Sequence, residues 1–195
     1  MEFTPKQLKV LQIEGSGTVG PQEDIWQVYM DGASNYRGAG VGIILISLEG
    51  IRLENSFRLG FPASNTEAEY EALLMGLKMS RQVGATWVKL YCDSSLIVSQ
   101  IIGKFKAKDQ RMMSYLREVE KLKCQFKRLE ILHISRRNNS HVDSLATLAS
   151  SVEDPLPRMV TVEILPFSSL TPSDKNLMLS IHSSVSWMDP IIAYL

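Results

Sequence analysis

The chain has 195 residues, of which 45% are hydrophobic, and its 21 basic and 21 acidic residues give a net charge of zero. This composition excludes wholesale disorder and a globally basic surface, so any contact with nucleic acid must come from local patches. No apolar run approaches the roughly 20 residues that span a bilayer, and the two cysteines match neither a zinc site nor a secreted disulfide pattern. We therefore expect a soluble, intracellular protein without a membrane partner.

Periodicity in the chain predicts a regular alternation of strands and helices after a glycine-rich lead-in or linker at 1–23. Alternating and β-branched patterns predict three strands in an antiparallel meander, and later two more strands. Helical spacing, with capping and stop signals, predicts four helices. The expected strands are 25–30, 39–46, 51–59, 87–92 and 129–134, and the expected helices are 64–84, 94–102, an amphipathic helix that includes 112–126, and 140–151.

The order βββαβααβα predicts an α/β fold: a mixed five-stranded sheet with helices on both faces, in a domain that spans 24–153. The first and fourth strands should lie side by side in parallel, joined by a crossover through the first helix. Beyond this domain, prolines appear among serines and threonines, and only 159–165 looks strand-like. We expect 154–195 to be a linker or a partial segment of a neighbouring unit.

The first predicted helix carries three glutamates near its start. Ser64 and Glu67 have the spacing of a capping box. Glu69 leans toward the apolar stripe of the helix, whereas Glu67 and Glu71 are expected to face water. A carboxylate directed at a core is costly unless it is paired or bound to a metal. The alternative is a glutamate at the rim of the helix that reaches solvent.

Two further acids stand at the carboxyl ends of predicted strands, where ligands collect in open α/β sheets. Asp31 follows the first strand and Asp93 the fourth, so the two should face each other across one crevice. Glu69 can point into that crevice, and Asp143 on the last helix is a plausible fourth member. Each acid also has an alternative role when it is considered alone. Asp31 could belong to an ordinary turn, Asp93 could be an acid at the start of a helix, and Asp143 could interact with the helix dipole.

Four carboxylates in one pocket raise one another's pKa and need cations to stay ionised together. Hard, oxygen-binding ions such as Mg²⁺ or Mn²⁺ suit such ligands. Two such ions, roughly 3.5 to 4 Å apart, activate a water and stabilise the leaving oxygen in phosphodiester hydrolysis. The four acids therefore predict a metal-dependent nuclease that needs no nucleophilic serine or cysteine.

Ordered short motifs over about 25–151 resemble type 1 ribonuclease H. The likeness is closest to the ribonuclease H part of plant gypsy-type LTR retrotransposon polyproteins, and 109–112 and 133–136 add to it. At the end of the chain, 187–195 resembles the spacer that leads into the integrase of such polyproteins. The motifs that carry the resemblance are Met30-Asp31-Gly32-Ala33-Ser34-Asn35, Gly38-Ala39-Gly40-Val41-Gly42, Asn65-Thr66-Glu67-Ala68-Glu69, Cys92-Asp93-Ser94 and Asn139-Ser140-His141-Val142-Asp143-Ser144-Leu145-Ala146.

This resemblance implies an enzyme that hydrolyses the RNA strand of RNA/DNA hybrids without strong sequence preference and leaves 3′-hydroxyl and 5′-phosphate ends. The implied catalytic, metal-binding acids are Asp31, Glu69, Asp93 and Asp143, with two Mg²⁺ ions as cofactors and Mn²⁺ as a substitute. Asp31 and Asp93 would bind or bridge both ions, while Glu69 and Asp143 would each bind one.

The resemblance also implies contacts to the minor groove and the 2′-hydroxyls of the hybrid from Asn35, Asn65 and Ser95, whose short polar side chains suit such contacts. A lysine-rich stretch could in addition contact phosphates. For the lysines, a solvated loop beside a charged helix is the alternative. The expected substrate-binding residues are Asn35, Asn65, Ser95, Lys104, Lys106, Lys108 and Asn139.

The chain departs from the family where many members carry a mobile histidine before the last acid. Here His133 is expected on the fifth strand, and His141 on the last helix has an open role. An alternative function is a decayed or domesticated retroelement fragment that binds nucleic acid without cleaving it. A DNA-processing nuclease on the same fold is a third possibility. Neither a dinucleotide fingerprint nor a polymerase motif is complete, and the oligomeric state stays open.

Overall fold

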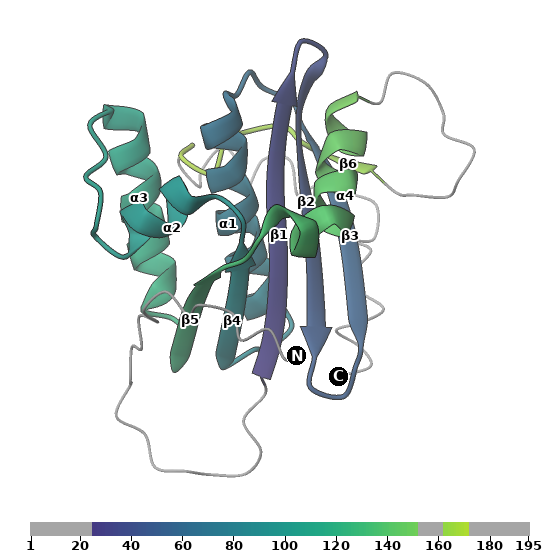
Figure 1. Ribbon diagram of the computed structural model, residues 1–195, viewed down its shortest axis with the longest axis vertical. Helices are drawn as coiled ribbons and strands as arrows, with labels where there is room; N and C mark the ends of the chain where they lie inside the picture. The colour runs from purple at the N-terminus through teal and green to yellow at the C-terminus, as the bar shows by residue number, and fades with distance from the viewer. Residues whose placement is uncertain (1–24, 152–161, 172–195) are drawn as a thin grey trace, which may run out of the picture.

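The computed structural model describes residues 25–151 and 162–171, which form one mixed sheet with helices packed against it (Figure 1). The expected lead-in at 1–23 and the integrase-like motif at 187–195 lie outside these residues. The strands are β1 (Ile25–Asn35), β2 (Gly38–Ser47), β3 (Arg52–Leu59), β4 (Trp87–Cys92), β5 (Arg128–His133) and β6 (Val162–Leu165). The helices are α1 (Asn65–Gln82), α2 (Ser95–Ile101), α3 (Gln110–Lys123), the 3₁₀ turn η1 (Arg136–Asn139) and α4 (Ser140–Ser151).

The sheet order is β5-β4-β1-β2-β3-β6. Strands β1, β2 and β3 form an antiparallel meander, and β4 pairs in parallel with β1 on one side and with β5 on the other. The predicted α/β class, the meander and the crossover from β1 to β4 are therefore confirmed.

One strand more than the five expected is present among the described residues. Strand β6 pairs in parallel with the outer edge of β3, where Ser56 lies opposite Val162 and Leu59 opposite Leu165. Part of the segment expected to be a linker thus joins the sheet. Strand β6 lies within 159–165, the stretch that looks strand-like in the sequence, but the sequence does not predict its pairing with β3, because the two strands are about a hundred residues apart in the chain. The domain limits at 24–153 and 154–195 stay predictions.

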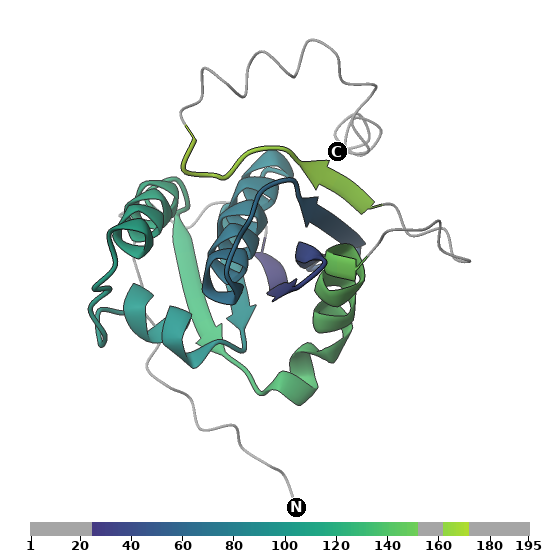
Figure 2. The same ribbon diagram turned by 90° about the horizontal axis from the view of Figure 1, so that it is seen from above.

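Two glycines let helices approach the sheet directly, one on each face. A Cβ atom at Gly32 would lie 2.2 Å from the backbone carbonyl carbon of Ala68 in α1. At Gly42 it would lie 2.4 Å from the carbonyl oxygen of Val142 in α4. Gly32 pairs with Val41, the neighbour of Gly42, and successive strand residues point to opposite faces. Helices α1 and α4 therefore cover opposite faces of the sheet, as Figure 2 shows from above.

The main core lies between the sheet and α1, and α3 packs on the outer side of α1. Apolar residues of β1 and β2 face buried residues of α1, among them Ala68, Ala72 and Leu73. Tyr70 of α1 stacks on Tyr115 of α3 with ring centroids 5.2 Å apart. None of the described helices combines the length and hydrophobicity that a membrane span requires.

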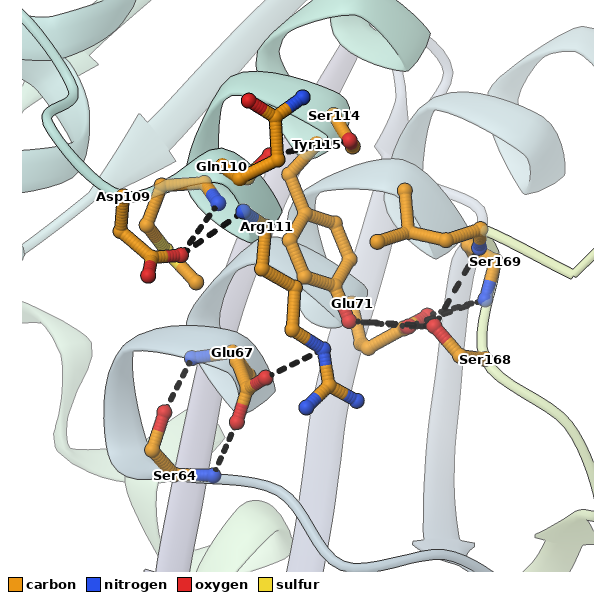
Figure 3. Close-up of polar contacts among 12 residues, drawn as sticks. Ser64, Glu67, Glu71, Asp109, Gln110, Arg111, Ser114, Tyr115, Ser168 and Ser169 are labelled. Carbon is orange, nitrogen blue, oxygen red and sulfur yellow. Dashed lines mark hydrogen bonds and ion pairs between the residues drawn. The ribbon is translucent and has the colours of Figure 1, made fainter.

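The expectation that Glu67 and Glu71 face water is wrong, because they are only 7% and 2% exposed. Glu67 closes the predicted capping box with Ser64 and forms an ion pair with Arg111, its Oε1 lying 2.7 Å from the arginine Nε (Figure 3). The carboxylate of Glu71 accepts hydrogen bonds from the hydroxyls of Tyr115 and of Ser168, which lies beyond β6. Helical periodicity alone predicts that charged residues face solvent, because it carries no information about partners from distant segments of the chain.

Candidate active site

Asp31 and Asp93 lie side by side at the point where β4 ends. Asp93 directly follows β4, whereas Asp31 lies inside β1, which continues to Asn35 beyond the expected end at residue 30, because residues 32–35 still pair with β2. The register of β1 and β4 places Tyr29 opposite Tyr91, so Asp31 and Asp93, each two residues further on, continue the same alignment. Asp31 is 8% exposed, and the side chain of Asp93 is 7% exposed. The parallel pairing therefore brings together two acids that are 62 residues apart in the sequence.

Glu69 reaches this edge of the sheet because α1 packs without a gap against Gly32. At that glycine, a Cβ atom would lie 2.3 Å from the backbone nitrogen of Glu69. Both carboxylate oxygens of Glu69 accept hydrogen bonds: Oε2 from the Ser94 hydroxyl at 2.9 Å and Oε1 from the Asn65 amide at 3.4 Å. Glu69 is half-buried, and these contacts hold it at the edge where Asp31 and Asp93 lie.

Asp143 comes from the opposite face of the sheet, in the first turn of α4. Helix α4 rests on Gly42, and Gly42 lies directly opposite Asp31 in the pairing of β1 with β2. Directly paired residues share one face of a sheet, so Asp31 and the start of α4 meet there. Asp143 contributes to the raised pKa of Asp31, both as a hydrogen-bonding neighbour and as a neighbouring charge.

The acidic side chains of the site influence one another's pKa. The pKa of Asp31 is raised from 3.8 to about 8, mainly by burial. The charge of Asp93 and the hydrogen bond and charge of Asp143 also raise this pKa, whereas the hydrogen bond from the Gly32 amide lowers it. Burial also raises the pKa of Glu69, with a contribution from Asp93, although the Ser94 hydroxyl and the charge of Arg136 oppose this. The mutual repulsion that the sequence predicts for clustered carboxylates is therefore present.

Arg136 is a site neighbour that the sequence reasoning did not single out. Its Nε lies 3.6 Å from Oδ2 of Asp93, and its side chain is 86% exposed. Ser94, besides donating to Glu69, caps α2 by accepting from the Ile97 amide. Arg136 follows β5, whose carboxyl end lies beside that of β4. The strand-end argument that found Asp93 could have found Arg136 as well.

The expected polar substrate residues are spread around this site. Asn65 begins α1, donates to Glu69 and accepts from the Ser34 amide at 3.3 Å. Asn35 ends β1 and donates to the Ser150 hydroxyl in α4 at 2.8 Å. Ser95 begins α2 and is exposed. Of these three, Asn65 is the one that touches a candidate catalytic side chain within the described part of the chain.

The remaining expected substrate residues differ in exposure. Lys104, Lys106 and Lys108 are all exposed in the segment between α2 and α3. Asn139, in contrast, is 1% exposed and donates from Nδ2 to the carbonyl oxygen of Met30 at 3.1 Å. Asn139 therefore ties η1 to β1 next to Asp31, and its side chain faces the strand instead of the surface.

Both nearby histidines lie on the predicted elements. His133 ends β5, and its Nε2 lies 3.1 Å from the carbonyl oxygen of Asp93. His141 lies on α4, and its Nε2 is 3.0 Å from Oε2 of Glu54. Among the described residues, neither ring hydrogen-bonds to any of the four acidic side chains.

Comparison with known proteins agrees with this geometry. Residues 30–149 match the family model described as Reverse transcriptase-like. Ribonuclease HI of Halobacterium salinarum is 33% identical over 124 residues, which cover 62% of this chain and 62% of that protein. The bifunctional protein Rv2228c of Mycobacterium tuberculosis is 33% identical over 84 residues, 43% of this chain and 23% of that protein. The chain thus spans less than two thirds of the length of these curated relatives.

Solved structures share the fold. The crystal structure of the Halobacterium salinarum RNase H1 superposes with a TM-score of 0.61 at 30% identity, covering 64% of this chain and 96% of that one. LC11-RNase H1, isolated from compost by a metagenomic approach, was solved in complex with an RNA/DNA hybrid. It superposes with a TM-score of 0.57 at 28% identity, covering 63% of this chain and 94% of that one. Since the family match covers well over half of the chain, the protein belongs to the reverse transcriptase-like family and carries a ribonuclease H-like domain.

Proposed function

We propose that this protein is a divalent-metal-dependent endonuclease that hydrolyses the RNA strand of RNA/DNA hybrids. The observation that carries the proposal is that strand pairing and close helix packing bring Asp31 next to Asp93, which follows β4, and next to the start of α4, which carries Asp143, within a ribonuclease H-like domain. A relative of the same fold in complex with an RNA/DNA hybrid supports the substrate class.

The donor set fits a hard cation, because all its ligand atoms are carboxylate oxygens. Asp31, Glu69, Asp93 and Asp143 would hold two Mg²⁺ ions, with Mn²⁺ as a substitute. The ions would supply the positive charge that activates a water and stabilises the leaving oxygen. Within residues 25–151 and 162–171, no three His, Cys, Asp or Glu side chains are gathered as a preformed metal cage.

The surrounding residues would bind the hybrid by shape and charge. Asn35, Asn65 and Ser95 offer short polar groups for 2′-hydroxyls and the minor groove, a mode of recognition that reads little sequence. Lys104, Lys106 and Lys108 would contact phosphates. We propose a structural role for Asn139 instead of a direct substrate contact. Its hydrogen bond to the Met30 carbonyl fixes η1 beside Asp31.

The motifs around Asp31, Glu69 and Asp143 also support a finer proposal about origin. They resemble the ribonuclease H part of plant gypsy-type retrotransposon polyproteins. We propose on this resemblance that the chain derives from such an element, and that cleavage leaves 3′-hydroxyl and 5′-phosphate ends. Electrophoresis of the products beside ladders with 3′-phosphate and 3′-hydroxyl ends tests the second statement.

The test of the function compares three end-labelled substrates of one sequence: an RNA/DNA hybrid, duplex DNA and duplex RNA. With Mg²⁺ or Mn²⁺, the chain is expected to cut only the RNA strand of the hybrid, and EDTA should stop the reaction. Cleavage of duplex DNA at a similar rate would instead identify a DNA-processing nuclease. Hybrid binding with no hydrolysis at any Mg²⁺ or Mn²⁺ concentration would identify a decayed fragment that binds without cutting.

A further inference from the structure

Residues 162–171, which we call the strap, return to the domain after α4 and lie outside the region that matches the family model. The strap begins as β6 on the edge of β3, and the Gly60 amide donates to the Leu165 carbonyl oxygen at 2.8 Å. Leu165 and Leu170 pack against the main core. The strap is thus held by strand pairing and by apolar burial, the two interactions that hold the rest of the domain together.

The strap also supplies hydrogen bonds to a buried acid in α1. Oε1 of Glu71, a residue that is 2% exposed, accepts from the Ser168 hydroxyl at 2.6 Å and from the Ser169 amide at 2.9 Å (Figure 3). Tyr115 of α3 donates to the same oxygen at 2.8 Å. The Ser169 amide also lies 3.1 Å from Oε2. Two of the three groups that donate to Glu71 among the described residues therefore belong to the strap.

These bonds matter because a buried carboxylate is strongly destabilising without donors. Burial raises the pKa of Tyr115 well above its ordinary value, so its hydroxyl keeps the proton that it donates. Two turns along α1 from Glu71, the ammonium group of Lys78 donates to the Ser169 hydroxyl at 2.9 Å. The strap therefore contacts α1 at two successive points on the same face of the helix.

The same helix carries Glu69, only two residues from Glu71. Since the backbone of α1 at Ala68 and Glu69 lies directly against Gly32, a small rotation or shift of α1 must move Glu69 relative to Asp31. Glu67 anchors the start of α1 to α3 through Arg111. Glu71 anchors the next turn to the strap, so the turn that presents Glu69 is fixed on both sides.

We propose that the strap is an integral part of the catalytic domain and that Glu71 is a positioning residue, which holds α1 so that Glu69 faces Asp31 and Asp93. The first half of this statement concerns the fold alone. The second half rests on the proposed nuclease function. Two measurements on the full chain therefore test the two halves separately.

The first measurement is amide hydrogen exchange of the metal-free, substrate-free chain. Ser168→Ala removes one donor to Glu71, together with the contacts of the same hydroxyl to the Leu170 amide at 3.2 Å and to the Tyr115 hydroxyl at 3.1 Å, and it lies outside β6. We expect protection of the α1 amides to fall about tenfold, while α4 changes less than about twofold, because hydrogen bonds to charged groups are among the stronger ones. The matched control is Ser114→Ala on α3, since the Ser114 hydroxyl donates to Gln110 of its own helix (Figure 3).

A second variant, Glu71→Gln, keeps the size of the side chain and removes the charge that the strap donors bind. It should lower protection of α1 and of the strap together, and Ser168→Ala should add little in the Glu71→Gln background, because both changes remove the same interaction. Unchanged α1 protection in Ser168→Ala, or a loss equal to that of Ser114→Ala, would overturn the strap's role in the fold whether or not the chain cuts hybrids.

The second measurement is steady-state cleavage of the hybrid. If Glu71 positions Glu69, Ser168→Ala should lower kcat several-fold at 25 °C and leave KM for the hybrid within about twofold, because the residues that bind the hybrid are untouched. Ser114→Ala should change neither constant. A kcat equal to that of the wild type, in a variant whose α1 exchanges faster, would overturn the positioning role and leave the strap's structural role standing. Failure of the wild type to cut hybrids would overturn the positioning role through the proposed function, and the exchange result would still decide the structural role.

Discussion

Gly42 lies directly opposite Asp31 on the neighbouring strand, and the backbone of α4 occupies the space where a side chain at position 42 would lie. The same relationship holds at Gly40, where a Cβ atom would lie 2.4 Å from the backbone nitrogen of Ser150 in α4. The glycines admit α4, and the start of α4 brings Asp143 to Asp31. The site therefore depends on a close contact between helix and strand as much as on the acids themselves.

Gly42→Ala is expected to destabilise the fold by roughly 1–3 kcal/mol, because its methyl group would overlap the Val142 carbonyl oxygen, 2.4 Å away, and α4 must move. Cleavage should fall further than stability alone explains, because Asp143 moves with α4. Gly50→Ala is the control: it has open space around it and a φ of 87°, so it reports only the strain of a left-handed backbone. Equal activity in the two variants, measured well below their melting temperatures, would contradict the proposed contact.

Asp31→Asn should stabilise the metal-free protein, as measured by urea unfolding in EDTA. The pKa of Asp31 is raised from 3.8 to about 8 in the fold, so its contribution to stability is fully present below pH 4 and is lost as the pH rises toward 8. Asparagine has no such titration. The difference between variant and wild type should therefore grow across this window and reach roughly 1–3 kcal/mol near pH 8. A difference that stays constant between pH 4 and 8 would show that the repulsion at Asp31 is relieved in another way.

The sequence was sufficient for the α/β class, the meander, the crossover and the placement of Asp31 beside Asp93, because parallel pairing follows from local patterns and a chirality rule. It was wrong about the end of the first strand, which runs past Asp31 to Asn35. It was insufficient for the pairing of β6 with β3, although 159–165 looks strand-like, and for the burial of Glu67 and Glu71. These features depend on partners far along the chain, such as Arg111 and Ser168. Asn139 shows the same limit: its residue type suits a substrate contact, yet its surroundings give it the carbonyl of Met30.

The three lysines between α2 and α3 should contribute to hybrid affinity through phosphates. Replacing Lys104, Lys106 and Lys108 together with glutamine is expected to weaken binding and to make the slope of log affinity against log salt shallower by roughly 0.7–0.9 for each phosphate that is no longer neutralised. Lys121→Gln, which removes an exposed lysine paired with Glu118 on α3, serves as the control. A salt dependence that is unchanged in the triple variant would place the lysines in a solvated loop that does not touch the hybrid.

His141 is expected to be dispensable for cleavage, because its ring hydrogen-bonds to Glu54 and not to the four acids in the described structure. His141→Gln keeps a polar group at that position. We expect its single-turnover rate to stay within about threefold of the wild type, whereas loss of a general acid or base typically costs about a hundredfold or more. His133→Gln should be compared in parallel, and a large loss in either variant would give that histidine a direct role.

We propose that Asp31, Glu69, Asp93 and Asp143 act together as one metal-dependent site. The most direct test is the rate at which wild type and Asp31→Asn cleave the labelled RNA strand of a hybrid in Mg²⁺, with circular dichroism to confirm that both are folded. We expect the wild type to cleave and the variant to be slower by more than about a hundredfold, since removing a metal ligand removes much of the transition-state stabilisation. A folded Asp31→Asn protein that cleaves the hybrid at the wild-type rate would contradict the claim.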